Sequence, residues 1–265
     1  MKIKEITEFL ETVAPLHYQE KYDNAGLIVG NAGDEFKAAL ICLDSTEEVV
    51  DEAISLGCNL IIAHHPIIFQ GIKKLTGKTY IGRAILKAIK NDIAIYAAHT
   101  NLDNAFENGV STKIAQKLGL DNLEILDPKP GLLIKGEKAG TGVLATLDKP
   151  AGEMEFLLEI KEKLNLPCLK YTRLRGQAVK KVAICGGACS FLLKKARMEG
   201  ADVFITADFK YHEYFDAENE IVIADIGHYE SEIYTIELIY DLLKNNFTNF
   251  AAHLTKVVTN PIKYL

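Results

Sequence analysis

The sequence predicts an α/β fold with two similar lobes, and two observations lead to this prediction. Short apolar runs alternate with helical stretches, a pattern typical of β-α-β units with parallel strands. The order strand, helix, glycine and strand then returns at an offset of 143 residues. The matching positions are Cys42 and Cys185, Gly57 and Gly200, and Ile62 and Ile205. This equal spacing indicates two related lobes with mixed, largely parallel sheets.

The first lobe is expected to contain three short apolar strands and the helices that connect them. The helix between the first two strands ends at Gly57, a residue typical of helix C-termini. The expected elements are an amphipathic helix at 1–13, a strand at 38–43, a helix at 45–57, a strand at 59–63, a helix at 79–90 and a strand at 93–98.

The second lobe is expected to repeat this layout after a connection rich in proline and glycine. The run Asp127-Pro-Lys-Pro-Gly and three further glycines cluster within 126–142. The predicted lobes therefore span 1–126 and 127–265, with the C-terminal segment able to pack back on the first. The expected elements are strands at 142–147, 168–172, 182–185, 201–207 and 220–226, and helices at 152–163, 190–199 and around 233–243.

Composition and charge exclude several classes of protein. Hydrophobic residues make up 48% and charged residues 25%, which excludes a mainly disordered chain. The net charge of −6, from 30 basic and 36 acidic residues, argues against general nucleic-acid binding, which needs a basic face. No apolar run reaches the roughly 18 residues of a membrane span, and the N-terminus lacks the apolar core of a signal peptide. We therefore expect a soluble, cytoplasmic protein without membrane contact.

The five cysteines predict no disulfide framework. Their number is odd, and none of them forms a Cys-x-x-Cys pair, so a zinc knuckle is not indicated either. Buried cysteine commonly behaves as a small apolar residue, and we expect most of these five to do so.

Two adjacent histidines follow the predicted strand at 59–63. Neighbouring residues in a regular strand point to opposite faces, so His64 and His65 can serve one site only where the strand ends and the chain turns. Pro66 favours such a turn. A pair of hydrogen-bonded surface histidines is the alternative, and it is the better explanation for this motif taken alone.

Two further segments end predicted strands of the same kind. Asp103 follows the strand at 93–98, and His228 follows the strand at 220–226 with Glu232 four residues later on the same helical face. Turn capping explains Asp103 equally well, and a carboxylate at a helix N-terminus explains Glu232. However, the carboxyl ends of parallel strands meet at one sheet edge, where ligands bind. Three such segments together favour a metal site between the two lobes.

The expected ligand set fits two metal ions better than one. His64, His65, Asp103, His228 and Glu232 are too many for one catalytic zinc, which takes three protein ligands and keeps a position open. Two ions bridged by a carboxylate and a water use five ligands. The two carboxylates balance half of the four positive charges that two divalent ions bring, so an anionic, phosphorylated substrate fits the site. Mixed nitrogen and oxygen ligands allow Zn, Mn, Fe, Co or Ni.

Six motifs in order along nearly the whole chain resemble the GTP cyclohydrolase I type 2 homologue family of dinuclear-metal-centre proteins. They are YDNAGLIVG (22–30), LIIAHHP (60–66), HTNLD (99–103), CGG (185–187), TADFKYHE (206–213) and GHYESE (227–232). The resemblance implies the same five ligands, with Glu232 as the bridge. It also implies a toroidal homohexamer whose sites face an internal cavity. The chain departs from the family pattern at Tyr22, at Ala207 and at Ala188-Cys189.

Weaker candidates surround this set. Gly186-Gly187, in the segment 186–190, could cradle an anion with backbone N–H groups, or simply form a tight turn. His99 and His212 could orient a ligand or relay a proton, although a hydrogen-bonded structural histidine is favoured for each. Asp23-Asn24 is expected to fix the turn at Gly26.

Two functions remain open on the sequence. The favoured one is a metal-dependent hydrolase of a nucleotide or another phosphorylated small molecule, of which GTP ring opening, suggested by the family's name, is one version. The alternative is a non-catalytic role in metal binding or regulation through protein interaction. Shared ligands cannot separate the two, because a fold and its motifs do not prove a reaction.

Overall fold

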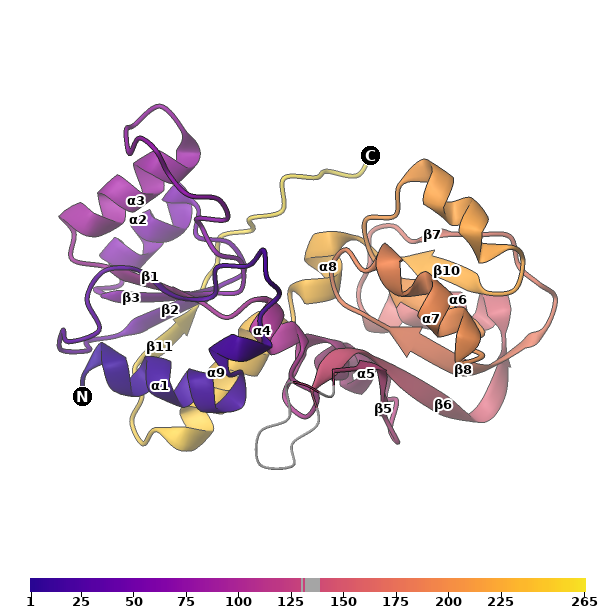
Figure 1. Ribbon diagram of the computed structural model, residues 1–265. Helices are drawn as coiled ribbons and strands as arrows, with labels where there is room; N and C mark the ends of the chain where they lie inside the picture. The colour runs from indigo at the N-terminus through magenta and orange to yellow at the C-terminus, as the bar shows by residue number, and fades with distance from the viewer. Residues whose placement is uncertain (130, 132–138) are drawn as a thin grey trace. The chain divides into compact units, whose positions relative to one another are not determined.

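The computed structural model describes residues 1–129, 131 and 139–265 (Figure 1). Their contacts divide the chain into two compact units. Unit 1 consists of Met1–Leu102 with Thr235–Pro261, and unit 2 consists of Asp103–Tyr234 with Ile262–Leu265. Each unit has its own mixed sheet and its own helices, which confirms the predicted α/β fold with two lobes.

Unit 1 contains a five-stranded sheet in the order β1-β4-β3-β2-β11. Its elements are α1 (Ile3–Val13), the 3-10 helix η1 (Leu16–Tyr18), β1 (Gly26–Val29), β2 (Ala39–Cys42), α2 (Glu47–Ser55), β3 (Leu60–Ala63), α3 (Tyr80–Lys90), β4 (Ala94–Ala97), α9 (Thr235–Asn246) and β11 (Ala252–Leu254). The short helix α4 (Thr100–Asp103) ends at the division between the units. β1 runs antiparallel to β4, and the other four strands are parallel.

Two helices cover each face of this sheet, with α2 and α3 on one face and α1 and α9 on the other (Figure 1). Leu40, Ile61 and Ile95 lie in register across β2, β3 and β4. They are fully buried in one core cluster with Val50 of α2 and Ile85 of α3. The three central strands are apolar throughout because both of their faces are covered.

Unit 2 contains a six-stranded sheet in the order β5-β6-β8-β9-β10-β7. Its elements are α5 (Val110–Leu118), β5 (Glu124–Pro128), β6 (Gly140–Gly152), α6 (Glu153–Lys163), β7 (Lys170–Tyr171), β8 (Ala178–Ile184), η3 (Ser190–Leu192), α7 (Leu193–Met198), β9 (Val203–Thr206), η4 (Tyr211–Ala217), β10 (Val222–Asp225) and α8 (His228–Glu232). The parallel strands β8, β9 and β10 form its centre. Ala183, Phe204 and Ile223 of these strands share a buried core with Leu193 and Ala196 of α7.

The predicted internal repeat is visible in the backbone. The bounds of β3 and β9 differ by the predicted offset, and each of these strands follows a glycine in the left-handed conformation. The φ angles are +69° at Gly57 and +72° at Gly200. Only glycine adopts such angles without strain, so the same turn is built twice. In the second copy the helix is shorter, because its first turn is the 3-10 helix η3.

The units differ from the predicted lobes 1–126 and 127–265. Residues 103–126 belong to unit 2, since β5 pairs with β6 and α5 packs on β6. The C-terminal α9 and β11 belong to unit 1, where both pack on β2. The expected joint at 126–142 includes residues 130 and 132–138, which lie outside the described part of the chain.

Two local expectations were wrong. A single helix was expected to follow His228, but the chain forms α8, turns at 233–234 and starts α9. This break is where the chain passes from unit 2 to unit 1.

No disulfide was expected, but Cys185 and Cys189 form one, because the turn after β8 brings their Cα atoms to 6.1 Å. As expected, Cys42 and Cys58 are buried and free.

Within the described residues, no helix combines the length and the apolar character needed to cross a bilayer.

Candidate metal centre

Three histidines of unit 1 lie at the carboxyl ends of its parallel strands. His64 and His65 follow β3, and His99 follows the neighbouring strand β4. One ring nitrogen of each histidine lies within 4.8 Å of those of the other two. His64 is fully buried and His99 is 9% exposed. The sequence predicted that His64 and His65 share a site, whereas His99 had only a supporting role.

Each of these histidines binds an oxygen through Nδ1. His64 Nδ1 lies 2.7 Å from the carbonyl oxygen of Ala98, and His65 Nδ1 lies 2.8 Å from Asp44 Oδ1. His99 Nδ1 lies 2.8 Å from Asp23 Oδ1. A carbonyl or carboxylate oxygen only accepts, so Nδ1 carries the proton. Nε2 is therefore the atom that each ring offers to a metal ion or a proton.

Asp23 is held as a carboxylate by its surroundings. It accepts hydrogen bonds from the backbone N–H groups of Asn24 and Thr100, from the Thr100 hydroxyl and from His99. Burial alone would raise the pKa of Asp23, but these bonds to the charged form lower it to about 2. The sequence assigned Asp23 only to the turn at Gly26, yet its carboxylate orients His99.

Asp44 holds His65 and is itself fixed from the C-terminal segment. The Thr259 hydroxyl donates to Asp44 Oδ2 over 2.6 Å, while Asp44 Oδ1 faces His65. Asp44 follows the end of β2, the strand next to β3. The three parallel strands therefore supply both the histidines and one of the carboxylates that orient them.

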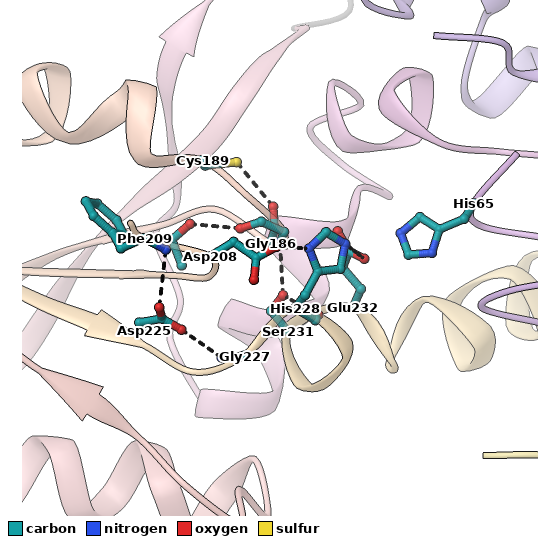
Figure 2. Close-up of polar contacts among 12 residues, drawn as sticks. His65, Gly186, Cys189, Asp208, Phe209, Asp225, Gly227, His228, Ser231 and Glu232 are labelled. Atoms are coloured by element: carbon teal, nitrogen blue, oxygen red, sulfur yellow. Dashed lines mark hydrogen bonds and ion pairs between the residues drawn. The ribbon is translucent and has the colours of Figure 1, made fainter. Parts of the chain in front are cut away.

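Unit 2 places a histidine and two carboxylates at the carboxyl end of its own parallel strands (Figure 2). His228 follows β10 and opens α8, and Asp208 follows β9. His228 Nδ1 lies 2.7 Å from Asp208 Oδ2, and His228 Nε2 lies 3.0 Å from Glu232 Oε2. The predicted helical spacing of His228 and Glu232 thus produces direct contact. The distance between His228 Nε2 and Glu232 Oε2 is close to that between two atoms that bind the same metal ion, each through a bond of about 2.1 Å.

The turn after β8 packs closely against α8 (Figure 2). The Gly187 N–H donates to the Ser231 hydroxyl over 2.9 Å, and the Gly186 N–H donates to the Ser111 hydroxyl. A Cβ atom on Gly187 would overlap the Glu232 carboxylate. These two N–H groups therefore serve a tight turn beside Glu232, and in this structure they form no anion cradle.

Two of the predicted site residues, Asp103 and His212, have surroundings different from those of the histidines described above. Asp103 is half-buried at the end of α4 and belongs to unit 2. His212 is exposed on η4, where its ring contacts the rings of Tyr211 and Phe215.

The carboxylates that orient the histidines were not predicted from the sequence. Asp44 and Asp208 each directly follow a predicted strand, so the rule that singled out His64 and Asp103 could have found them. Asp23 gave no such signal, because it precedes the antiparallel strand β1. It reaches His99 because Gly26, at the start of β1, pairs with Ala97 at the end of β4.

A fold of two α/β units with histidines and carboxylates at the strand ends defines a class of candidate metal-binding proteins. The chain belongs to the Duf34/NIF3 (NGG1p interacting factor 3) family, whose model matches residues 1–261.

Relatives cover most or all of the chain. A Clostridium perfringens protein named GTP cyclohydrolase 1 type 2 homolog is 36% identical over 88% of this chain and 87% of its own length. A Campylobacter jejuni protein of the same name is 33% identical over the full length of both. A crystal structure of a hypothetical protein from Staphylococcus aureus matches with a TM-score of 0.91 and 31% identity, over 100% of this chain and 99% of the other. A Bacillus cereus protein related to NIF3 gives a TM-score of 0.90 and 27% identity over the same shares.

Proposed function

We propose that this chain binds two divalent metal ions through His64, His65, Asp103, His228 and Glu232, and hydrolyses a nucleotide or another phosphorylated small molecule. The observation that carries the proposal is the common orientation of the histidines. His64, His65 and His228 each hold an oxygen at Nδ1, which presents Nε2 as the ligand atom. The relatives' names, GTP cyclohydrolase 1 type 2 homolog, favour a nucleotide as substrate.

The donor atoms fit divalent transition metals. Neutral imidazole nitrogen and carboxylate oxygen together suit Zn, Mn, Fe, Co or Ni. When bound, such ions activate water and neutralise anionic charge. Asp44 and Asp208 would keep His65 and His228 oriented while ions and substrate exchange, since each carboxylate fixes one ring through Nδ1.

The proposed ligand set also predicts that the substrate is negatively charged. The two ligand carboxylates, Asp103 and Glu232, carry half as much charge as two divalent ions, so the ions retain positive charge with which to bind a phosphate group. Nothing in the described residues singles out guanine, so the proposal extends only to the substrate class.

Elemental analysis and a substrate screen test the proposal in sequence. Purified protein should carry about two divalent ions per chain, and the double variant H64A/E232A should lose both. The wild-type protein and this variant are then screened with GTP, other nucleotides and generic phosphodiesters.

Turnover by the wild-type protein alone supports the hydrolase. A metal-free wild-type protein, or full metal content in the variant, overturns the metal site. Equal turnover in both proteins, or none in either, overturns the hydrolase and favours the alternative of a non-catalytic metal-binding or interaction protein. The predicted homohexamer is tested on the same samples, since light scattering would give six chains per particle.

A further inference from the structure

We propose that the Cys185–Cys189 disulfide of unit 2 is reversibly reduced by a dithiol, and that its redox state controls metal binding through the position of Glu232. This inference rests on the proposed metal binding and adds a regulation of the same site. It depends on three observations: the disulfide closes the turn after β8, this turn packs against Glu232, and the turn can accommodate both redox states.

The disulfide closes a turn that is fixed to two other elements of unit 2. Gly187 lies midway along the turn 185–189. Its carbonyl oxygen accepts hydrogen bonds from the Ala207 N–H and the Thr206 hydroxyl, both over 3.0 Å, at the end of β9. Its N–H donates to a hydroxyl of α8, the helix that carries Glu232. The disulfide therefore constrains the segment that joins β9 to α8.

The turn leaves no free space beside the proposed ligands of α8. A Cβ atom on Gly187 would overlap Glu232 Oε1 and would lie 3.7 Å from His228 Cε1. Glu232 itself is 3% exposed, so its carboxylate is enclosed by its neighbours. Close-packed interiors transmit displacements, so a change in the turn shifts the carboxylate or releases it.

The turn can accommodate the reduced state as well as the disulfide. Cys189 Sγ lies 3.2 Å from the carbonyl oxygen of Gly186 (Figure 2). In the reduced state this sulfur carries a proton that it can donate to that oxygen, whereas a disulfide sulfur has no proton to donate. Reduction therefore replaces a covalent link across the turn by one weak hydrogen bond, which loosens the turn without breaking the chain's fold.

Unit 2 is expected to stay folded when the disulfide is reduced. The stabilisation that a disulfide provides grows with the length of the loop it closes, and these cysteines are only four positions apart. Both are buried in the apolar core of unit 2, where a reduced cysteine packs as a small apolar side chain. A redox change can therefore act on the site while the core persists.

The proposed reaction is thiol–disulfide exchange. A thiolate of the dithiol attacks Cys189 Sγ, because Cys189 is 7% exposed and Cys185 only 2%. The S–S bond breaks, and Cys185 leaves as a thiolate that takes up a proton. The second thiol of the dithiol then attacks the mixed disulfide and releases Cys189, which is also protonated. Two electrons and two protons pass from the dithiol, which becomes a disulfide, to the two cysteines.

The experiment compares Mn²⁺ binding by the oxidised and the reduced full chain. Mn²⁺ is the probe because thiolates favour softer ions, so neither the reagents nor the reduced cysteines capture it. Metal-free protein is treated with oxidised glutathione or with dithiothreitol, and the reagent is removed without air. Thiol counting after denaturation should give three thiols in the oxidised chain and all five in the reduced chain.

The oxidised chain is expected to bind Mn²⁺ about 10-fold more tightly than the reduced chain, as followed by electron paramagnetic resonance of the free ion. C185S/C189S should bind as weakly as the reduced chain and should not respond to either reagent. C168S is the control, since Cys168 is an exposed free cysteine of the same unit, and it should respond like the wild-type protein. Circular dichroism checks that every form is folded.

A second measurement follows the redox state itself. Because coupling between two equilibria is reciprocal, saturating Mn²⁺ should shift the thiol–disulfide equilibrium of the wild-type protein with glutathione toward the disulfide by the same factor, about 10-fold. This readout depends on neither turnover nor the serine variants.

The outcomes separate the two proposals. Absence of Mn²⁺ binding in both redox states of the wild-type protein overturns the metal site and the switch together. Equal Mn²⁺ affinity in the two states overturns only the switch. Three thiols remaining after dithiothreitol treatment of the folded chain overturn the reversible reduction. A redox response that persists in C185S/C189S overturns the role of this cysteine pair.

Discussion

At the residue scale, Gly187 is closely packed against the candidate ligand Glu232. Its φ of +71° lies in the left-handed region, and its N–H binds Ser231 on α8. A side chain there would occupy the space of the Glu232 carboxylate. Gly200 has nearly the same φ, +72°, but a Cβ atom added to it would meet nothing within 4 Å. Replacing each of these glycines by alanine therefore separates the free-energy cost of a left-handed backbone from the additional cost of overlap with Glu232.

The substitution G200A is expected to lower the free energy of unfolding by about 1 kcal/mol, the cost of a left-handed alanine. G187A carries the same cost plus that of displacing Glu232, giving about 3 kcal/mol in total. Denaturant unfolding of both variants checks the difference. Metal content should fall in G187A alone, and equal losses of stability in the two variants would contradict the close contact.

At the element scale, Arg175 joins three segments of unit 2. Its guanidinium lies 2.9 Å from Glu153 at the start of α6 and 2.9 Å from Asp202 before β9. It also donates to the carbonyl oxygen of Glu220 before β10. The Arg175 and Glu153 side chains are 8% and 3% exposed, so the pair is largely desolvated. Burial raises the pKa of Asp202, but hydrogen bonds from the backbone N–H groups of Lys181 and Lys180 and from Arg175 lower it overall.

We expect R175A to reduce the free energy of unfolding by about 3 kcal/mol, because it leaves the buried Glu153 carboxylate without its cation. R173A, which removes an exposed arginine two residues away, should cost less than about 0.5 kcal/mol. Chemical denaturation of the two variants provides the comparison. A small effect of R175A would show that the carboxylates are solvated in solution.

At the scale of the whole molecule, each unit has a core that needs no metal. The core cluster of unit 1 lies between its sheet and the helices α2 and α3, and that of unit 2 includes β8, β9, β10 and α7. The candidate ligands lie beyond the strand ends, outside both clusters. Metal ions would therefore stabilise the folded chain by binding to it without being required for folding.

Removal of metal by a chelator is therefore expected to leave the far-ultraviolet circular dichroism unchanged and to lower Tm. An ion at 1,000 times its Kd contributes about 4 kcal/mol, so the shift should be about 10 °C. Restoring Co²⁺ should restore Tm in the wild-type protein but not in H64A/E232A. Loss of secondary structure on chelation would contradict the view that the cores form independently.

Much of this structure could be predicted from the sequence, and the misses have physical causes. The central strands were predicted because fully buried strands are apolar along their whole length, as in β3 with Leu60, Ile61 and Ile62. The edge strands β1, β5 and β11 were missed, since each is partly exposed and lacks that pattern. The break between α8 and α9 was missed because apolar periodicity does not reveal which unit a residue packs against.

The sequence by itself determined the α/β class, the repeated β-α-β unit and the strand-end histidines, because these depend on local order along the chain. Only the tertiary structure decided which carboxylate lies behind which histidine. Asp23 and His99 are 76 residues apart, and they meet because β1 pairs antiparallel with β4. Asp44 and Thr259 are 215 residues apart and meet because β11 extends the sheet beside β2. Such contacts depend on strand pairing across the sheet, which no local pattern of residues specifies.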